Sequence, residues 1–275
     1  MTSRAGRSVT VEAAAGVKPA RRPKIVPTLE KEESLFQAGA VGVVGFDEVG
    51  RGSLAGPVMV GAALLLEPDA QDAAEAGART RDSGLSEHSE RKQRMLAIPA
   101  GLTDSKTLSE RKREALFEPL QGWVDAWGVG AASNKEIDQW GISHALGVAA
   151  LRALQQIEQM ASAAGLALAD KPVDGILDGP YDYIAPAASS MDAPHLGFLP
   201  RVSTQVKADA RCALVSAASV LAKVVRDRLM EGYAREPRYQ AYGWDSNKGY
   251  GSPAHRAAIA EHGPSDLHRL TWHLC

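Results

Sequence analysis

The alternation of apolar and polar segments first predicts two strands. Residues 41–47 and 58–66 are each almost continuously apolar, the pattern of strands that are buried on both faces of a sheet. They are separated by about ten residues that are rich in glycine, among them Gly50 and Gly52. A connection this short predicts an antiparallel pair.

Two long helices are predicted further along the chain. Residues 142–160 place apolar side chains at helical spacing, and residues 210–230 do the same with many small alanines and serines, which allow close packing against a sheet. Shorter apolar runs at 127–132 and 173–177 predict two more strands. This order of elements predicts an α/β fold with a mixed β-sheet flanked by helices, followed by a helical C-terminal part at 233–275.

Two polar segments lack this periodicity and predict disorder. Residues 1–34 are rich in Ala, Arg, Lys and Pro, and residues 67–100 form a polar stretch longer than most connections inside a compact domain. We therefore expect a disordered N-terminal tail, a disordered insertion, and one domain over residues 35–275. Beyond the insertion, Ser109 is a plausible helix cap, and Pro119 is expected to end or kink the helix.

The composition is that of a globular protein without a membrane span. The 275 residues are 45% hydrophobic and carry a formal net charge of −2, yet no apolar run approaches the roughly 20 residues that cross a bilayer. No apolar segment follows the first basic residues, so we expect a cytoplasmic protein without a secretory signal. Cys212 and Cys275 lack metal-ligand spacing and are expected to be free thiols, and the seven histidines are expected at the surface.

Four acidic residues stand at the ends of predicted elements: Asp47, Glu48, Asp178 and Asp209. Each has a simpler explanation, namely solvated acids at a strand end for the first two, a turn for the third, and a helix N-cap for the fourth. Neighbouring strand residues also point to opposite faces, so the first two share a site only if the strand ends or bulges there. Together, however, four carboxylates suit two Mg²⁺ or Mn²⁺ ions about 4 Å apart, an arrangement that hydrolyses phosphodiesters.

Glycine-rich loops supply candidate contacts to nucleic acid. Lys248 and Tyr250 lie in a Lys-Gly-Tyr-Gly loop, where a cation can hold a phosphate and a ring can stack on a sugar or base. Lys106 allows the same interpretation, and for each of these residues a plain loop is the simpler alternative. The glycines around Arg51 match neither a phosphate loop nor a dinucleotide motif, which disfavours a nucleotide cofactor.

Several sequence blocks resemble the bacterial ribonuclease HII family. They are GFDEVGRGSLAGPV (residues 45–58), GLTDSKTLSERKRE (101–114), ILDG (176–179), KADARCALVSAASVLAKVVRDRLM (207–230) and SNKGYGSPAH (246–255). The resemblance implies a ribonuclease H-like sheet and catalytic domain. One departure lies beside the fourth carboxylate, where the family usually has Gly-Asp-Ser and this chain has Ala208-Asp209-Ala210. The insertion at 67–100 is also longer than the family's usual connection.

The resemblance also assigns roles to the candidate residues. It implies that Asp47, Glu48, Asp178 and Asp209 bind the metal ions, that Gly50, Arg51 and Gly52 sense the 2′-hydroxyl of a ribonucleotide, that Tyr250 stacks at the RNA–DNA junction, and that Lys106 and Lys248 contact phosphates. The implied enzyme is a Mg²⁺- or Mn²⁺-dependent endonuclease.

The implied substrates are RNA–DNA hybrids and duplex DNA that contains single ribonucleotides, cut on the 5′ side of the ribonucleotide to leave a 3′-hydroxyl and a 5′-phosphate. Such an activity removes ribonucleotides during DNA replication and repair. We expect a monomer without a membrane partner. The alternative from another class is a non-catalytic nucleic-acid-binding module, which the four carboxylates disfavour because they would repel phosphates.

Overall fold

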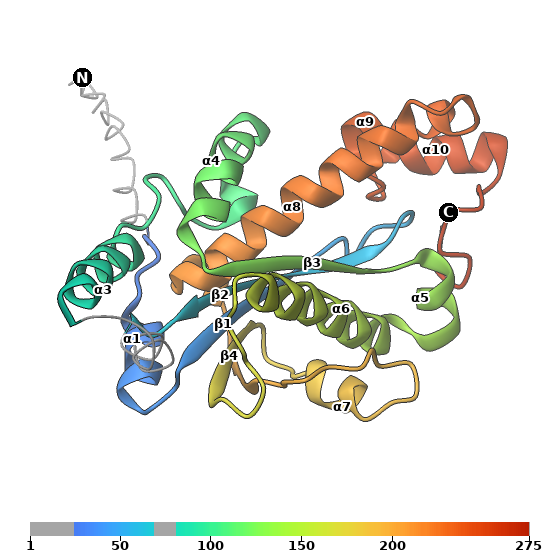
Figure 1. Cartoon of the computed structure of the whole chain (residues 1–275). Coiled ribbons are helices and arrows are strands. Elements are labelled where there is room, and N and C mark those ends of the chain that lie inside the picture. The colour runs from blue at the N-terminus through green and yellow to red at the C-terminus, as the bar shows by residue number, and fades with distance from the viewer. Residues whose placement is uncertain (1–24, 69–80, 275) are drawn as a thin grey trace, which may run out of the picture.

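A five-stranded mixed sheet forms the centre of the protein (Figure 1). The computed structural model describes residues 25–68 and 81–274. In the sheet the strand order is β3-β2-β1-β4-β5. The strands are β1 (Gly42–Val49), β2 (Val58–Leu66), β3 (Ala126–Ala132), β4 (Val173–Asp178) and β5 (Arg201–Gln205). β2 is antiparallel to both β1 and β3, whereas β4 is parallel to β1 and β5, so the predicted antiparallel pair and mixed sheet are confirmed.

One long helix covers each face of the sheet. Val44 and Phe46 pack with α6 (Ile142–Ala163) in one core, whereas Val43 packs with α8 (Ala213–Ala234) in the other. This division follows from the alternation of side chains along a strand. The α8 face is close-packed, because a Cβ added at Gly45 would lie 2.5 Å from the Leu214 carbonyl carbon. The small residues at this contact therefore bring the helix against the strand.

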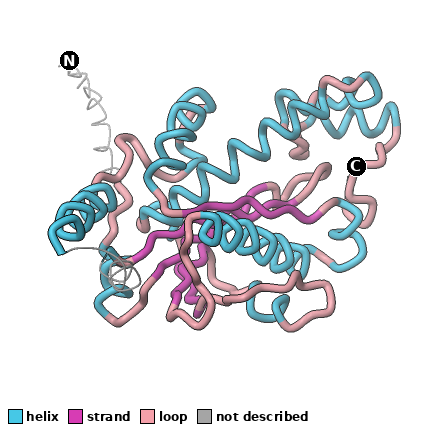
Figure 2. Tube along the Cα trace, viewed as in Figure 1, coloured by secondary structure: helices cyan, strands magenta, loops and turns pink. Residues whose placement is uncertain are grey.

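Shorter helices surround this three-layered core (Figure 2). They are α1 (Glu30–Gln37), α3 (Arg81–Leu96), α4 (Glu110–Trp123), α5 (Asn134–Trp140), α7 (Ile184–Ala188), α9 (Trp244–Asn247) and α10 (Pro253–His262), with 3-10 turns η1 (Ser105–Thr107), η2 (Ala208–Ala210) and η3 (Pro237–Tyr242). α8 runs on past the sheet toward α9 and α10, where Trp244 and Ile259 pack against Met230 in a separate small core. The expected helical C-terminal part is thus present. No helix in the described ranges has the length and apolarity of a membrane span.

The two predicted disordered segments are partly ordered. Within the expected tail, Thr28 forms a parallel bridge with Cys212, and α1 follows with Glu32 fully buried. Within the expected insertion, residues 81–96 form α3, whose buried Met95 accepts a hydrogen bond from the Trp123 indole at 3.0 Å. Disorder is therefore wrong for residues 25–34 and 81–96. Residues 1–24 and 69–80 lie outside the described part of the chain.

Local predictions differ from the structure in detail. Pro119 lies inside α4, which continues to Trp123, so it does not end the helix, and Ser109 is the N-cap residue as predicted but forms no side-chain cap hydrogen bond. α8 begins at Ala213, so Asp209 is not its N-cap but lies in the preceding turn η2. β5 was not predicted, since its residues are mostly exposed and polar at the edge of the sheet.

Candidate active site

Asp47 is the most buried of the four candidate carboxylates, with 3% of its surface exposed. It lies on the α8 side of β1, close to Ser219 and Lys106. Burial raises the pKa of Asp47 well above its usual range, and the charges of Glu48 and Asp178 add to this effect. The Ser219 hydroxyl and the Lys106 ammonium act in the opposite direction without cancelling it. The explanation of Asp47 as a solvated acid is therefore wrong.

Glu48 lies on the other side of the same strand. β1 stays paired with β2 through Val49, opposite Met59, so the strand neither ends nor bulges at Asp47 and Glu48, and the condition for both to face one side is not met. Glu48 instead accepts hydrogen bonds from the Tyr183 hydroxyl at 3.4 Å and from Arg51 at 3.3 Å. The pairing of β1 with β4 ends at Phe46 and Leu177, however, so Asp47 and Glu48 stand where this pairing ends, next to Asp178, the last residue of β4.

Asp178 and Asp209 are brought together by the packing of β4 against η2. Asp178 is the last residue of β4 and accepts a hydrogen bond from the Ala208 backbone N–H at 2.7 Å. Asp209 follows in the 3-10 turn and is 6% exposed. Burial raises the pKa of Asp209, and the nearby charge of Asp178 raises it further. The Asp178 side chain therefore connects β4 to η2, in contrast to the simple turn that was the alternative explanation for this residue.

Lys106 places a cation among these carboxylates. Its ammonium donates to Asp209 Oδ2 at 3.2 Å, from a turn that Asp104 stabilises by accepting the Lys106 backbone N–H. Burial lowers the pKa of Lys106, but the charges of Asp47 and Asp209 outweigh it, and the pKa is raised above its ordinary value. The charges of Asp47 and Asp209 therefore stabilise the protonated ammonium of Lys106.

The donor set fits a hard divalent cation, although the carboxylates do not converge on one point. Across residues 25–68 and 81–274, no three carboxylates, imidazoles or thiols form a group that could hold a metal ion in this arrangement. The acids still influence one another, because Asp178 raises the pKa of both Asp47 and Asp209. Their oxygens are the ligands that Mg²⁺ and Mn²⁺ prefer, and a bound cation would offset the repulsion that Lys106 offsets only in part.

The glycine-rich turn after β1 is joined directly to the loop of Tyr250. The Gly50 backbone N–H donates to the Tyr250 hydroxyl at 3.2 Å, and Ser53 forms an antiparallel bridge with Tyr250. Arg51 and Gly52 are exposed at the tip of this turn. The structure thus brings together the predicted 2′-hydroxyl sensor and the predicted stacking ring.

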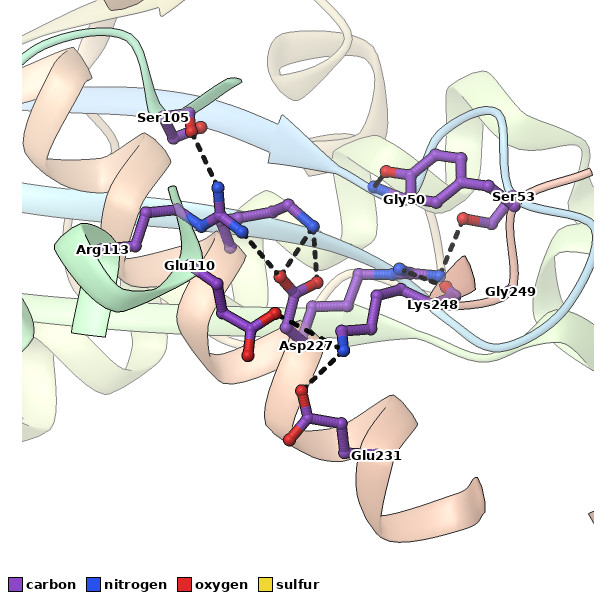
Figure 3. Close-up of polar contacts among 12 residues, drawn as sticks. Gly50, Ser53, Ser105, Glu110, Arg113, Asp227, Glu231, Lys248 and Gly249 are labelled. Carbon is purple, nitrogen blue, oxygen red and sulfur yellow. Dashed lines mark hydrogen bonds and ion pairs between the residues drawn. The ribbon is translucent and has the colours of Figure 1, made fainter. Parts of the chain in front are cut away.

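The Lys248 side chain points away from Gly50 and toward Glu231 (Figure 3). It is 7% exposed, and its ammonium forms ion pairs with Glu231 at 2.7 Å and with Glu110 at 3.7 Å. It also donates to the Asp245 carbonyl. Because two acids already surround this ammonium, its position is unfavourable for a phosphate.

Two histidines contradict the expectation of surface positions. His255 and His268 are fully buried, and their Nε2 atoms lie 3.1 Å apart. Burial lowers the pKa of both, to about 4 for His268, so both are neutral near pH 7. His255 Nε2 accepts the Trp244 indole N–H at 3.0 Å, and its Nδ1 lies 2.9 Å from the Tyr250 carbonyl. The pair therefore supports the loop that carries Tyr250.

A cavity of about 390 Å³ lies beside the carboxylates. Arg51, Asp178, Tyr181 and Tyr183 contribute to its wall. Tyr181 is 75% exposed, so its ring is available to a ligand in the cavity. The sequence analysis did not identify either tyrosine. The only local signal is their position directly after Asp178, since a residue that follows a site strand often reaches the same site.

Two further residues near the turn were missed for a physical reason. Arg226 and Arg269 are fully buried. Because arginine is mostly exposed in folded proteins, a sequence alone gives no reason to expect it in the interior. No local sequence signal distinguishes Arg226, because charged residues surround it at Lys223, Asp227 and Arg228.

Comparison with known proteins identifies the family. Residues 87–275 match the family model for ribonuclease HII. The chain is 39% identical over 247 residues to the ribonuclease HII of Streptomyces avermitilis, covering 90% of this chain and 83% of that protein. It is 35% identical to the ribonuclease HII of Paracoccus denitrificans, covering 90% and 91%. The chain belongs to the ribonuclease HII family. This ribonuclease HII is therefore a ribonuclease H endonuclease, which sets aside the alternative of a non-catalytic binding module.

Solved structures agree with the fold. Ribonuclease H2 from Pyrococcus horikoshii OT3 is similar with a TM-score of 0.52 and 24% identity, covering 85% of this chain and 94% of that one. Bst-RNase HIII in complex with Mn²⁺ is similar with a TM-score of 0.53 and 22% identity, covering 87% and 69%. At these identities the similarity concerns the fold, and it confirms the ribonuclease H-like α/β architecture of this ribonuclease HII.

Proposed function

We propose that this ribonuclease HII hydrolyses the RNA strand of RNA–DNA hybrids and cuts on the 5′ side of single ribonucleotides in duplex DNA, leaving a 3′-hydroxyl and a 5′-phosphate. The observation that supports this most is the direct link between the turn of residues 50–52 and Tyr250, made by the Gly50 N–H and the Tyr250 hydroxyl at 3.2 Å. The carboxylates of Asp47 and Glu48 lie in the strand that leads into this turn. Recognition of a ribose and cleavage beside it would thus depend on one continuous segment.

The proposed metal ligands are Asp47, Glu48, Asp178 and Asp209. Bound Mg²⁺ or Mn²⁺ would activate a water molecule as the nucleophile and stabilise the leaving oxygen. The fold relative that was solved with Mn²⁺ makes such a cofactor reasonable for this chain. Glu48 lies on the opposite side of its strand, held by Tyr183 and Arg51, and is therefore proposed as a ligand on the Arg51 side.

The remaining roles follow from position and charge. Lys106, exposed beside Asp209, is proposed to contact a phosphate of the cleaved strand. Tyr250, which is 37% exposed, is proposed to stack at the RNA–DNA junction. An activity of this kind would serve ribonucleotide removal during DNA replication and repair. The cytoplasmic location and the monomeric state stay predictions from the sequence.

A cleavage assay with a matched variant tests this proposal. The wild type, Asp47→Asn and the control Asp192→Asn are incubated with a DNA duplex that contains one ribonucleotide, in Mg²⁺ and in EDTA. Asp192 is an exposed acid that is not one of the four carboxylates, and it pairs with His144. We expect cleavage by the wild type and by Asp192→Asn in Mg²⁺ only, and at least about a hundredfold loss for Asp47→Asn. Cleavage in EDTA, or equal cleavage by Asp47→Asn, would refute the metal site.

A further inference from the structure

Two arginines are fully buried behind the turn of residues 50–52. Arg226 extends from α8, and Arg269 lies in the segment that follows α10, each with 0% of its surface exposed. Among the described residues, the hydrogen bonds of both guanidiniums go to carbonyls and one hydroxyl and not to a carboxylate. Burial, followed by the charge of Arg226, lowers the pKa of Arg269 to about 9, which leaves it protonated near pH 7. Two buried charges that are not hydrogen-bonded to a carboxylate are costly, so their contacts need an explanation.

Arg269 binds the carbonyls of the turn itself. Its Nη2 donates to the Gly50 carbonyl at 2.6 Å, and its Nη1 donates to the Arg51 carbonyl at 2.8 Å. Nε and Nη2 also lie 3.2 Å from the Gly56 carbonyl, at the end of the same loop. One guanidinium therefore draws the first two carbonyls of the turn toward the interior.

Arg226 binds the second half of the loop and connects it to the loop of Tyr250. It donates to the Pro57 carbonyl at 3.0 Å and to the Ser53 hydroxyl at 2.9 Å. A further N–H donates to the Lys248 carbonyl at 3.0 Å, and the guanidinium lies 5.4 Å from the centre of the Tyr250 ring. Figure 3 shows Gly50 and Ser53 beside Gly249, where the two loops meet.

The direction of these carbonyls fixes the direction of the neighbouring N–H groups. In a trans peptide the C=O of one residue and the N–H of the next point in opposite directions, and the described chain contains no cis peptide. Because the Gly50 and Arg51 carbonyls point inward to Arg269, the N–H groups of Arg51 and Gly52 point outward. Both residues are exposed, and neither N–H donates a hydrogen bond within the described residues.

We propose that Arg269 and Arg226 are positioning residues for ribose recognition, holding the turn so that the Arg51 and Gly52 N–H groups face the 2′-hydroxyl of the substrate. This inference rests on the proposed function, in which that turn senses the ribonucleotide. Arg269 orients the Gly50 and Arg51 carbonyls. Arg226 holds the loop that contains Ser53 against the loop that contains Tyr250. Neither guanidinium contacts the substrate itself.

Binding measurements separate this role from a purely structural one. The dissociation constant is measured in EDTA for a duplex with one ribonucleotide and for the same duplex made only of DNA, with wild type, Arg269→Lys and Arg226→Lys. Lysine keeps the charge but cannot hold several carbonyls in one plane. The control is Arg152→Lys, because Arg152 also binds a carbonyl, that of Ala131 at 2.7 Å, but donates no hydrogen bond to the turn of residues 50–52.

The decisive quantity is the ratio of the two dissociation constants. We expect the wild type and Arg152→Lys to bind the ribonucleotide duplex more tightly than the all-DNA duplex. In Arg269→Lys and Arg226→Lys this preference should fall about tenfold, while the dissociation constant for the all-DNA duplex stays unchanged. A preserved ratio in the Arg269 and Arg226 variants would refute the positioning role alone. An absent preference in the wild type would instead refute ribose sensing and therefore the proposed function.

A second measurement uses only the wild type, so it tests the inference even if the variants fail to fold. Amide hydrogen exchange of residues 51 and 52 is compared in complexes with the two duplexes. We expect both amides to be protected by the ribonucleotide duplex and not by DNA. Equal protection by both duplexes, or protection by neither, would overturn the inference.

Discussion

At the scale of single residues, the structure separates two lysines that the sequence treats alike. Lys106 and Lys248 both precede or follow glycine- and serine-rich turns, and both were predicted to contact phosphates. Lys106 lies against Asp209 near Asp47, whereas Lys248 is enclosed by Glu231 and Glu110. A local motif identifies a candidate cation but not the charged residues that tertiary folding places around it.

This difference predicts opposite effects of one substitution. Lys106→Met should lower the cleavage rate at least about tenfold with little change in stability, because it removes charge from the site. Lys248→Met should lower the free energy of unfolding by about 1 to 3 kcal/mol with a small effect on cleavage, because Glu231 loses its partner. Cleavage rates and urea unfolding of the two variants check this. A larger loss of activity in Lys248→Met than in Lys106→Met would contradict it.

The glycines of the turn give a second matched pair. Gly50 has φ of +79°, and an added Cβ would lie 2.1 Å from Nε of Arg226, whereas a Cβ at Gly52 would meet nothing within 4 Å. Gly50→Ala should therefore lower the free energy of unfolding by about 2 to 4 kcal/mol, from backbone strain and overpacking. Gly52→Ala should leave it nearly unchanged. Urea unfolding measures both, and equal stability of the two variants would contradict the described packing.

At the scale of elements, prediction succeeded where burial is continuous and failed where packing is sparse. The run of residues 58–66 predicted β2 with its observed bounds, because both faces of this strand are buried. β5 was missed since its exposed edge residues carry no apolar pattern. α1 and α3 carry no apolar pattern that predicts a helix, because only a few residues, such as Leu29 and Met95, provide their burial. Sequence periodicity cannot reveal an element that is stabilised by so few contacts.

The docking of α1 on α8 makes the stability of the protein depend on pH. Glu32 is fully buried and accepts the Leu214 N–H at 2.9 Å, and burial raises its pKa from 4.5 to about 7. The folded protein therefore holds this proton more tightly than the unfolded chain does. Its contribution to stability is fully present below pH 4.5 and is lost as the pH rises through about 7.

Glu32→Gln should remove this dependence, because the amide keeps the shape of the neutral carboxyl. Relative to the wild type, its free energy of unfolding should increase by about 2 to 3 kcal/mol between pH 4.5 and pH 8. Glu30→Gln, at an exposed position of the same helix, should show no such trend. Urea unfolding across this pH range provides the test. Parallel pH profiles for wild type and Glu32→Gln would show that Glu32 is not held neutral.

At the scale of the whole molecule, the site combines segments that are distant in the sequence. Asp47 and Glu48 were identified by their setting in an apolar strand, and Asp178 and Asp209 by their position at element ends. The opposite orientation of Glu48 and the support from Arg269 depend on the fold, because Arg269 reaches Gly50 from the far end of the chain. In the proposed function, the carboxylates, the turn and Tyr250 act together to cut beside a single ribose.

The most direct test compares one duplex in three forms. A single position carries a ribonucleotide, a 2′-O-methyl ribonucleotide or a deoxynucleotide, and the wild-type products in Mg²⁺ are mapped to the nucleotide. The proposed function predicts one cut, on the 5′ side of the ribonucleotide, with 3′-hydroxyl and 5′-phosphate ends, and no cut in the other two duplexes. Cleavage of the all-DNA duplex, or a cut elsewhere in the ribonucleotide duplex, would contradict it.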